Sequence, residues 1–143
     1  MGVVADVQTY LEAQGIIGGV TGWKSLRRAI VDGPGDLPSD FDQMVSIRED
    51  GGFAAEVKAA QGIGDAAIGR PAVLVTVRAK KADGDASGAK AQEIFSALNS
   101  LIGTIGDGSY LVVNARTSEP VFVGFDERGR PLHTIGFVLM ISL

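Results

Sequence analysis

The sequence contains no cysteine, one histidine and one tryptophan. The absence of cysteine excludes disulfide bonds, thiolate metal sites and a cysteine nucleophile. A single histidine excludes a two-histidine zinc motif and leaves His133 as the one candidate base of a catalytic triad. No G-x-S-x-G pattern marks a nucleophilic serine. We therefore expect His133 to face solvent or a subunit interface, and we predict that the protein is not an enzyme.

Charged residues are scarce, at 21% of the chain, whereas hydrophobic residues make up 45%. The charged share lies below the roughly 25% of an average soluble domain. We therefore expect part of the surface to be hidden against other subunits. The 13 basic and 17 acidic residues give a net charge of −4, which argues against a general nucleic-acid-binding protein. This charge is compatible with DNA passing the protein without specific binding.

Long apolar runs are also absent. The longest, residues 135–143, has about half of the roughly 20 residues that a membrane-spanning helix needs. The N-terminal segment carries Asp6 and Glu12 and no basic residue, so it does not resemble a signal peptide. The sequence predicts a soluble protein that is made in a reducing compartment and has no membrane partner.

The periodicity of apolar residues predicts two helices, over residues 2–14 and 88–102. It also predicts five strands, over residues 42–50, 72–79, 110–116, 121–125 and 132–143. This order is typical of a single α+β domain over residues 1–143. We expect a mainly antiparallel sheet with the N-terminal helix and the central amphipathic helix packed on it.

Two segments have weak patterns. Residues 49–71 are rich in alanine and glycine, and we predict a long mobile loop there. Residues 15–31 contain a glycine-rich stretch that reads as a loop, and the rest of that segment is ambiguous.

The last predicted strand has two apolar faces. One face carries Ile135, Phe137 and Leu139, and the helix over residues 88–102 is its expected cover. The other face carries Val138 and Met140 between smaller residues and is too apolar to be left in water. We expect this second face to meet the N-terminal helix or a neighbouring subunit.

Two motifs resemble ligand sites but lack the context that those sites need. The G-x-G-x-x-A pattern over residues 62–67 has no preceding strand, and Gly69 and Pro71 prevent a following helix, so a dinucleotide site is disfavoured. The segment over residues 83–88 resembles half of a calcium loop, but Ile94 stands where the bidentate glutamate should be. A turn followed by a helix with Ser87 as its cap explains that segment. We predict no cofactor and no metal.

The candidate subunit-interface residues are Trp23, Asp126, Arg128, Arg130, Val138 and Met140. Trp23 follows a glycine-rich loop and is equally compatible with a partner anchor and with the core. The charged turn over residues 126–131 precedes the last strand, where a rim contact could set the register between subunits. On this interpretation Arg130→Glu leaves the subunit folded and weakens assembly.

Three segments resemble the tail terminator proteins of long-tailed bacteriophages, also described as minor capsid or tail-completion proteins. They are PAVLVTVRA (residues 71–79), AQEIFSALNSLIG (residues 91–103) and ARTSEPVFVGFDERGRPLHTIGFVLMI (residues 115–141). The segment over residues 31–50 is similar less specifically. The resemblance covers about 100 residues. None of these segments is a catalytic signature. The resemblance consists of the order of the elements, the residues of the turns and the segment lengths.

This resemblance implies a structural role. Such proteins form a hexameric ring on the last ring of the tail tube, stop its polymerisation and provide a docking face for the head-side connector. The implied partners are further copies of the chain, the tail tube protein and the head–tail connector or stopper protein. The implied location is the head-proximal end of the virion tail, with assembly in the host cytoplasm.

Other interpretations of the sequence remain open. One is a neck or head-completion protein that docks on the portal side. Another is a small-molecule-binding α+β module that uses the glycine-rich loop over residues 62–69. A third is a hydrolase that uses His133.

Overall fold

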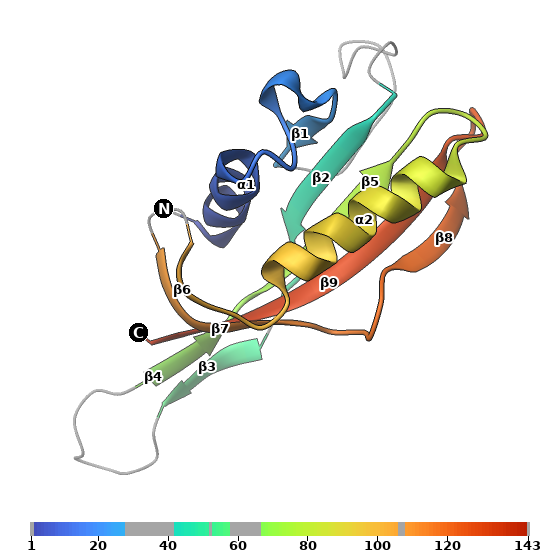
Figure 1. Ribbon diagram of the computed structural model, residues 1–143. Helices are drawn as coiled ribbons and strands as arrows, with labels where there is room; N and C mark the ends of the chain where they lie inside the picture. Colours follow the sequence, from blue (N-terminus) through green and yellow to red (C-terminus); the bar gives the residue numbers. More distant parts are fainter. Residues whose placement is uncertain (1, 28–41, 52, 58–66, 106–107, 143) are drawn as a thin grey trace.

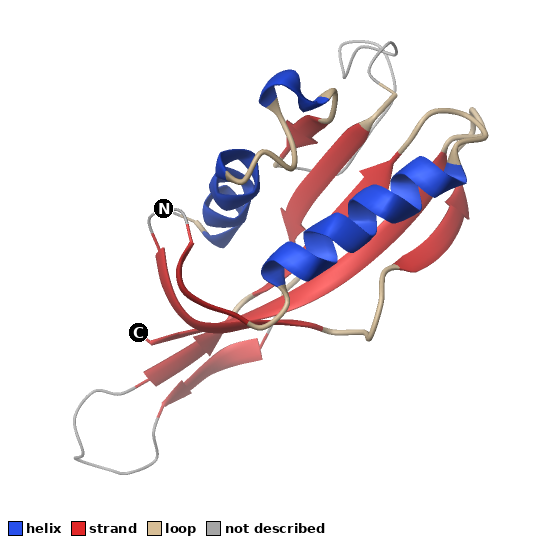
Figure 2. Ribbon diagram, viewed as in Figure 1, coloured by secondary structure: helices blue, strands red, loops and turns tan. Residues whose placement is uncertain are grey.

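A curled sheet with two helices on one face forms the described part of the chain (Figures 1 and 2). The computed structural model describes residues 2–27, 42–51, 53–57, 67–105 and 108–142. The helices are α1 (Val3–Ala13) and α2 (Gly84–Leu98), and a short 3-10 helix, η1, covers Gly19–Thr21. The strands are β1 (Lys24–Leu26), β2 (Met44–Glu49), β3 (Phe53–Val57), β4 (Ala67–Arg70), β5 (Ala72–Arg78), β6 (Leu101–Ile105), β7 (Gly108–Ala115), β8 (Val121–Phe125) and β9 (Pro131–Ser142). The predicted α+β class is confirmed.

Strand β9 organises the sheet. One of its edges pairs with β5 and, further along, with β4; its other edge pairs with β8 and then with β7. Beyond β5 the sheet continues through β2 to β1. Strands β1 and β2 are parallel, and all the other described pairs are antiparallel.

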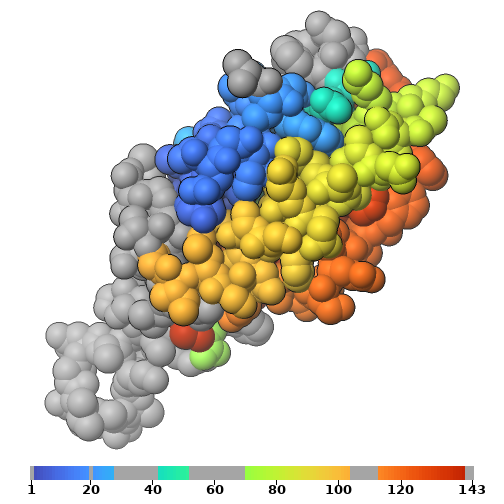
Figure 3. Space-filling view, in the orientation of Figure 1, coloured from blue at the N-terminus to red at the C-terminus, as the bar shows by residue number. Residues whose placement is uncertain are grey.

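Both helices pack on the same face of this sheet. Alternate residues of the strands point toward the helices because successive side chains of a strand lie on opposite faces. The buried cluster on this face contains Val45, Ile47, Val73, Val75, Val77, Ile135, Phe137 and Leu139 from the strands and Val7, Leu11, Ala91, Ile94 and Leu98 from the helices. Figure 3 shows α1 and α2 side by side over this face. The predicted cover of Ile135, Phe137 and Leu139 by the central helix is confirmed.

Of the two partners expected for the second face of the last strand, the N-terminal helix is excluded, and contact with a neighbouring subunit stays a prediction. Helix α1 contributes Val7 and Leu11 to the same core as α2. Val138 and Met140 belong to the opposite face of the sheet and remain partly exposed. Among the described helices, neither lies on that opposite face.

The predicted long loop over residues 49–71 is also wrong where the structure describes that segment. Strand β2 runs to Glu49, and β3 pairs with β4 as an antiparallel hairpin. Strand β4 joins the sheet because β9 extends beyond β5 and offers Ile141 and Ser142 for pairing. Ala- and Gly-rich strands have little period of their own, so this pairing is not visible in the sequence. Residues 58–66 lie outside the described residues.

Helix α2 lies about four residues earlier than predicted, at Gly84–Leu98 instead of 88–102. Asp83 is the N-cap, and its carboxylate accepts a hydrogen bond from the Ala86 amide at 3.2 Å. Ser87, the predicted cap, lies inside the helix and donates to the Gly84 carbonyl. After the helix, Ser100 takes a left-handed conformation with φ 66° and the chain enters β6.

We expect Asp83→Ala to destabilise the protein by about 1 kcal/mol, because it removes the side-chain acceptor from the helix N-terminus. The matched control is Asp85→Ala, since Asp85 is an exposed acid in the first turn but not the cap. Urea unfolding of the two variants measures both losses. Equal losses would contradict the assignment of Asp83 as the cap.

Candidate functional site

Ser87 and His133 form the nearest arrangement to a catalytic pair among the described residues. The Ser87 hydroxyl oxygen lies 2.7 Å from His133 Nδ1, and it also lies 3.1 Å from the Gly84 carbonyl, to which it donates. In the contact with His133 the donor is set by the tautomer of the imidazole ring. Ser87 is fully buried, and the His133 ring packs against Phe122 with 5.2 Å between centroids. This contact joins α2 to β9.

His133 is half-buried, so it does not face solvent freely, and its expected alternative place at a subunit interface stays a prediction. Burial lowers the pKa of His133 below its ordinary value of 6.5. Neutral imidazole is therefore the favoured form in the folded protein.

Metal and cofactor motifs find no support in the described residues. No group of three or more His, Asp or Glu side chains lies close enough to hold a metal ion within the part of the chain that the structure describes. Residues 83–88, which resemble half of a calcium loop, form the cap and first turn of α2. This agrees with their interpretation as a turn followed by a helix start. Of the G-x-G-x-x-A pattern, residues 62–66 lie outside the described residues. No helix in the described residues is long and apolar enough to cross a membrane.

The charged turn before β9 is tied into the protein interior. Asp126 accepts hydrogen bonds from the Arg130 side chain at 2.7 Å and from the Arg130 amide at 2.9 Å. Arg130 also donates to the Asp42 carboxylate at 3.2 Å. Arg78, from β5, lies 3.9 Å from Asp126 and donates to the Asp42 carbonyl. Arg78 and Arg130 are each only 1% exposed.

These contacts set the ionisation of Asp126. Burial alone would raise the pKa of its carboxyl, but the hydrogen bonds from Arg130 and the Arg128 amide, with the Arg130 charge, bring the pKa below 3.8. The stabilisation from this carboxylate is therefore present above pH 3.8 and is lost as the pH falls through the lowered pKa.

The expectation that Arg130→Glu leaves the subunit folded rested on a premise that the structure contradicts. It assumed a solvated turn charge, whereas Arg130 is a buried partner of two carboxylates. Asp126 is likewise occupied inside the subunit. Of the three charged residues singled out in this turn, Arg128 is the exposed one.

The sheet face opposite the helices carries an ion pair that spans several strands. Arg116, just after β7, crosses over Gly136 of β9 and donates to Asp50, just after β2, at 3.1 Å. A Cβ atom at Gly136 would come within 3.0 Å of the Arg116 Cδ, so the glycine makes room for this side chain. Val138 lies next to Gly136 in the pairing with β5. This face is partly apolar and partly charged.

Strand β8 presents the largest described group of exposed apolar side chains. Its exposed members are Val121, Phe122, Val123 and Phe125. Phe122 is 49% exposed and Phe125 is 62% exposed, and their rings contact edge to face at 5.3 Å. Natural edge strands normally carry charges or proline that prevent pairing with another chain. Strand β8 has neither, and its exposed apolar side chains form the kind of patch that is typical of protein interaction surfaces.

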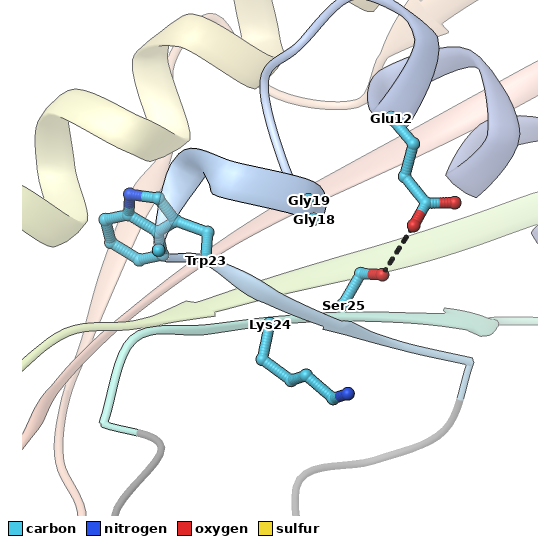
Figure 4. A pocket seen from close by; sticks show the side chains of 7 residues that line it. Glu12, Gly18, Gly19, Trp23, Lys24 and Ser25 are labelled. Atoms are coloured by element: carbon cyan, nitrogen blue, oxygen red, sulfur yellow. Dashed lines mark hydrogen bonds between the residues drawn. The ribbon is translucent and has the colours of Figure 1, made fainter.

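Trp23 lies in the core and is 8% exposed, so the core interpretation of this residue is confirmed. Lys90 of α2 lies over its ring, with Nζ 5.5 Å from the ring centroid, and donates to the Ile16 carbonyl. Beside Trp23 a hollow of about 320 Å³ opens between the end of α1, η1 and β1 (Figure 4). Its lining is Glu12, Gly18, Gly19, Gly22, Trp23, Lys24 and Ser25.

The hollow owes its shape to glycine. Gly18 has φ 70°, and a Cβ atom there would lie 2.8 Å from a Glu12 carboxylate oxygen. Glu12 in turn accepts a hydrogen bond from the Ser25 hydroxyl at 3.3 Å. Sequence reasoning identified the glycine-rich stretch as a loop, but it missed both this hollow and the exposed strand β8. The signal for β8 was the uncharged run VFVGF, which reads equally well as a buried strand.

A solved structure shares this architecture. A chain described as "Virion of native gene transfer agent (GTA) particle" aligns with a TM-score of 0.60 and 16% sequence identity, covering 99% of this chain and 95% of that one. No curated protein matches the sequence. A small α+β subunit with an exposed apolar edge strand is typical of a component of a larger assembly.

The family model described as "Bacteriophage tail terminator protein" matches residues 31–142. The chain therefore belongs to the bacteriophage tail terminator proteins, and the resemblance found in its sequence is confirmed. It is a structural component of the phage virion tail.

We expect Arg130→Glu to destabilise the folded subunit by about 3–5 kcal/mol, because it breaks a buried ion pair and places a third carboxylate beside Asp126 and Asp42. The matched control is Arg128→Glu, which changes an exposed charge in the same turn and should cost far less. Urea unfolding measures the two losses. A small loss for Arg130→Glu would contradict its place in a buried cluster.

The lowered pKa of His133 predicts a pH dependence of stability. Because the unfolded chain takes up a proton at a higher pH than the folded one, the contribution of neutral His133 is full above pH 6.5 and declines as the pH falls below it. His133→Gln should lack this decline. Urea unfolding from about pH 8 to about pH 5, the range in which histidine changes charge, compares the two proteins. Parallel curves would rule out the linkage.

Proposed function

We propose that the protein forms a hexameric ring on the end of the tail tube, stops tube polymerisation and offers a docking face to the head-side connector. The observation that carries this proposal is the match to the tail terminator family over residues 31–142. A ring subunit needs two different complementary surfaces, one for each neighbour. The exposed strand β8 is suited to be one of them.

The proposal gives the remaining candidate residues separate roles. Arg128, exposed in the turn before β9, lies where a contact between subunits would be accessible. Val138 and Met140 belong to the sheet face that neither described helix covers, and we assign them to contact with a neighbouring subunit. Asp126 and Arg130 support these surfaces from inside the subunit by holding the turn.

The charge of the chain suits a channel for DNA. Six copies of a chain with net charge −4 carry −24 in total. An acidic ring repels phosphate, so DNA would pass through the lumen without being held. The tail tube protein and the head–tail connector are the proposed partners, at the head-proximal end of the tail, with assembly in the host cytoplasm.

Tail length tests this function. Deleting the gene from the phage should produce tails that overgrow, since nothing stops addition of tube subunits, and supplying the intact protein should restore one uniform length. Electron microscopy of lysates measures the distribution. Tails of normal length that fail to join heads would assign the protein to the neck instead, and unchanged virions would remove it from tail assembly.

A further inference from the structure

Strands β1 and β8 are the two opposite edges of one part of the sheet (Figure 1). Each pairs with one neighbour among the described strands, β1 with β2 and β8 with β9. Between them lie β2, β5 and β9. No other described strand pairs with the outer edge of either strand, and beside β1 the η1 segment occupies that edge only at Trp23, whose carbonyl accepts a hydrogen bond from the Gly18 amide at 2.7 Å.

The registers place these two edges at the same level along the strands. One continuous row of paired residues consists of Lys24, Met44, Arg78, Leu132 and Gly124. A second row runs from Ser25 of β1 to Phe122 of β8, and a third from Leu26 to Val121. Contact between the two edges therefore needs no shift along the strand direction. A head-to-tail contact forms a closed ring when its rotation closes and it carries no shift along the axis, whereas a contact with such a shift repeats as a helix.

The strand directions are also compatible. Strand β1 is parallel to β2, and three successive antiparallel pairings lead from β2 through β5 and β9 to β8. Strand β8 therefore runs antiparallel to β1. Rotation about an axis along the strands keeps this relation, so β8 of one copy meets β1 of the next as an antiparallel pair, which a sheet readily accepts.

The side chains on the two edges match in position. Phe122 packs on His133, which contacts Ser87 of α2, so the two phenylalanines lie on the helix-bearing side of β8. The hollow beside β1 is lined by Glu12 of α1 and by the η1 segment, so it also opens on the helix-bearing side (Figure 4). Its volume of about 320 Å³ and the three glycines in its lining leave room for the two phenylalanine side chains.

We propose that β8 of one subunit adds to β1 of the next subunit, with Phe122 and Phe125 filling the hollow beside Trp23. The inference rests on the proposed ring and names the contact that closes it. A second copy of this chain is the occupant because one chain carries both halves of the contact at matching levels of opposite edges. Ring closure would then continue the sheet from subunit to subunit.

Chemical cross-linking tests this contact cleanly, because the natural chain has no cysteine. Val121 and Lys24 are exposed, and they occupy the face opposite the helices on their respective edges. Val121→Cys and Lys24→Cys are placed in one chain, which is assembled on tail tubes and treated with a short bifunctional thiol reagent. We expect a ladder of covalent oligomers up to the size of the ring.

The single variants are the matched controls. A mixture of V121C chains and K24C chains should give dimers and nothing larger, because each contact then joins one chain of each kind. Dimers from V121C alone would show a β8–β8 contact and overturn the proposal. Rings visible by electron microscopy that yield no cross-links from the double variant would also overturn it, while leaving the proposed function intact. Absence of any ring on the tubes would instead count against the proposed function.

A second measurement tests whether the phenylalanine side chains contribute to assembly, independently of any cross-link. Phe125→Ser should raise the protein concentration needed for half-maximal ring assembly by roughly tenfold or more, as loss of an aromatic anchor does at a protein interface. The control is Ile102→Ser, since Ile102 of β6 is 73% exposed but lies on neither edge. The control should assemble like the natural protein. Equal effects of the two substitutions would contradict a specific role for β8.

Discussion

The whole architecture depends on strand β9, a twelve-residue strand with neighbours on both edges. Its Ile135, Phe137 and Leu139 supply the floor on which α2 packs, and its ends hold the β3–β4 hairpin and strand β8. Long strands with two occupied edges have no free hydrogen-bonding groups to offer. Pairing with another chain must therefore take place at the shorter strands around β9.

In the C-terminal half, the most charged segment holds a buried arginine and an uncharged apolar strand is exposed, which is the reverse of what residue type alone indicates. The turn before β9 is the most charged part of the C-terminal half, yet Arg130 and Arg78 are buried around Asp126 and hold the turn to the sheet. Strand β8, with no charge, is the exposed one. Breaking a buried ion pair of this kind is strongly destabilising, because it leaves an uncompensated buried charge. Here the ion pairs orient the edge that precedes them in the chain.

The candidate interface residues show how well residue type alone predicts which side chains are accessible. Arg128, Val138 and Met140 were chosen for charge or apolarity and lie at accessible positions. Trp23, Asp126 and Arg130 were chosen in the same way, but their side chains are engaged inside the subunit. Arg130 and Asp42, 88 residues apart, are brought together by the fold. No local pattern in the sequence reports such a contact.

Local periodicity determined the α+β class, the strands β2, β5, β7, β8 and β9, and the buried faces of α1 and β9, because each depends on residues within a few positions of one another. Three segments of the sequence also resembled the tail terminator family, to which the chain belongs. Only the tertiary structure decided that β3 and β4 are strands, that both helices share one face, and that β1 and β8 end the same rows of the sheet. These features arise from pairing between distant segments, whose energy outweighs weak local preferences.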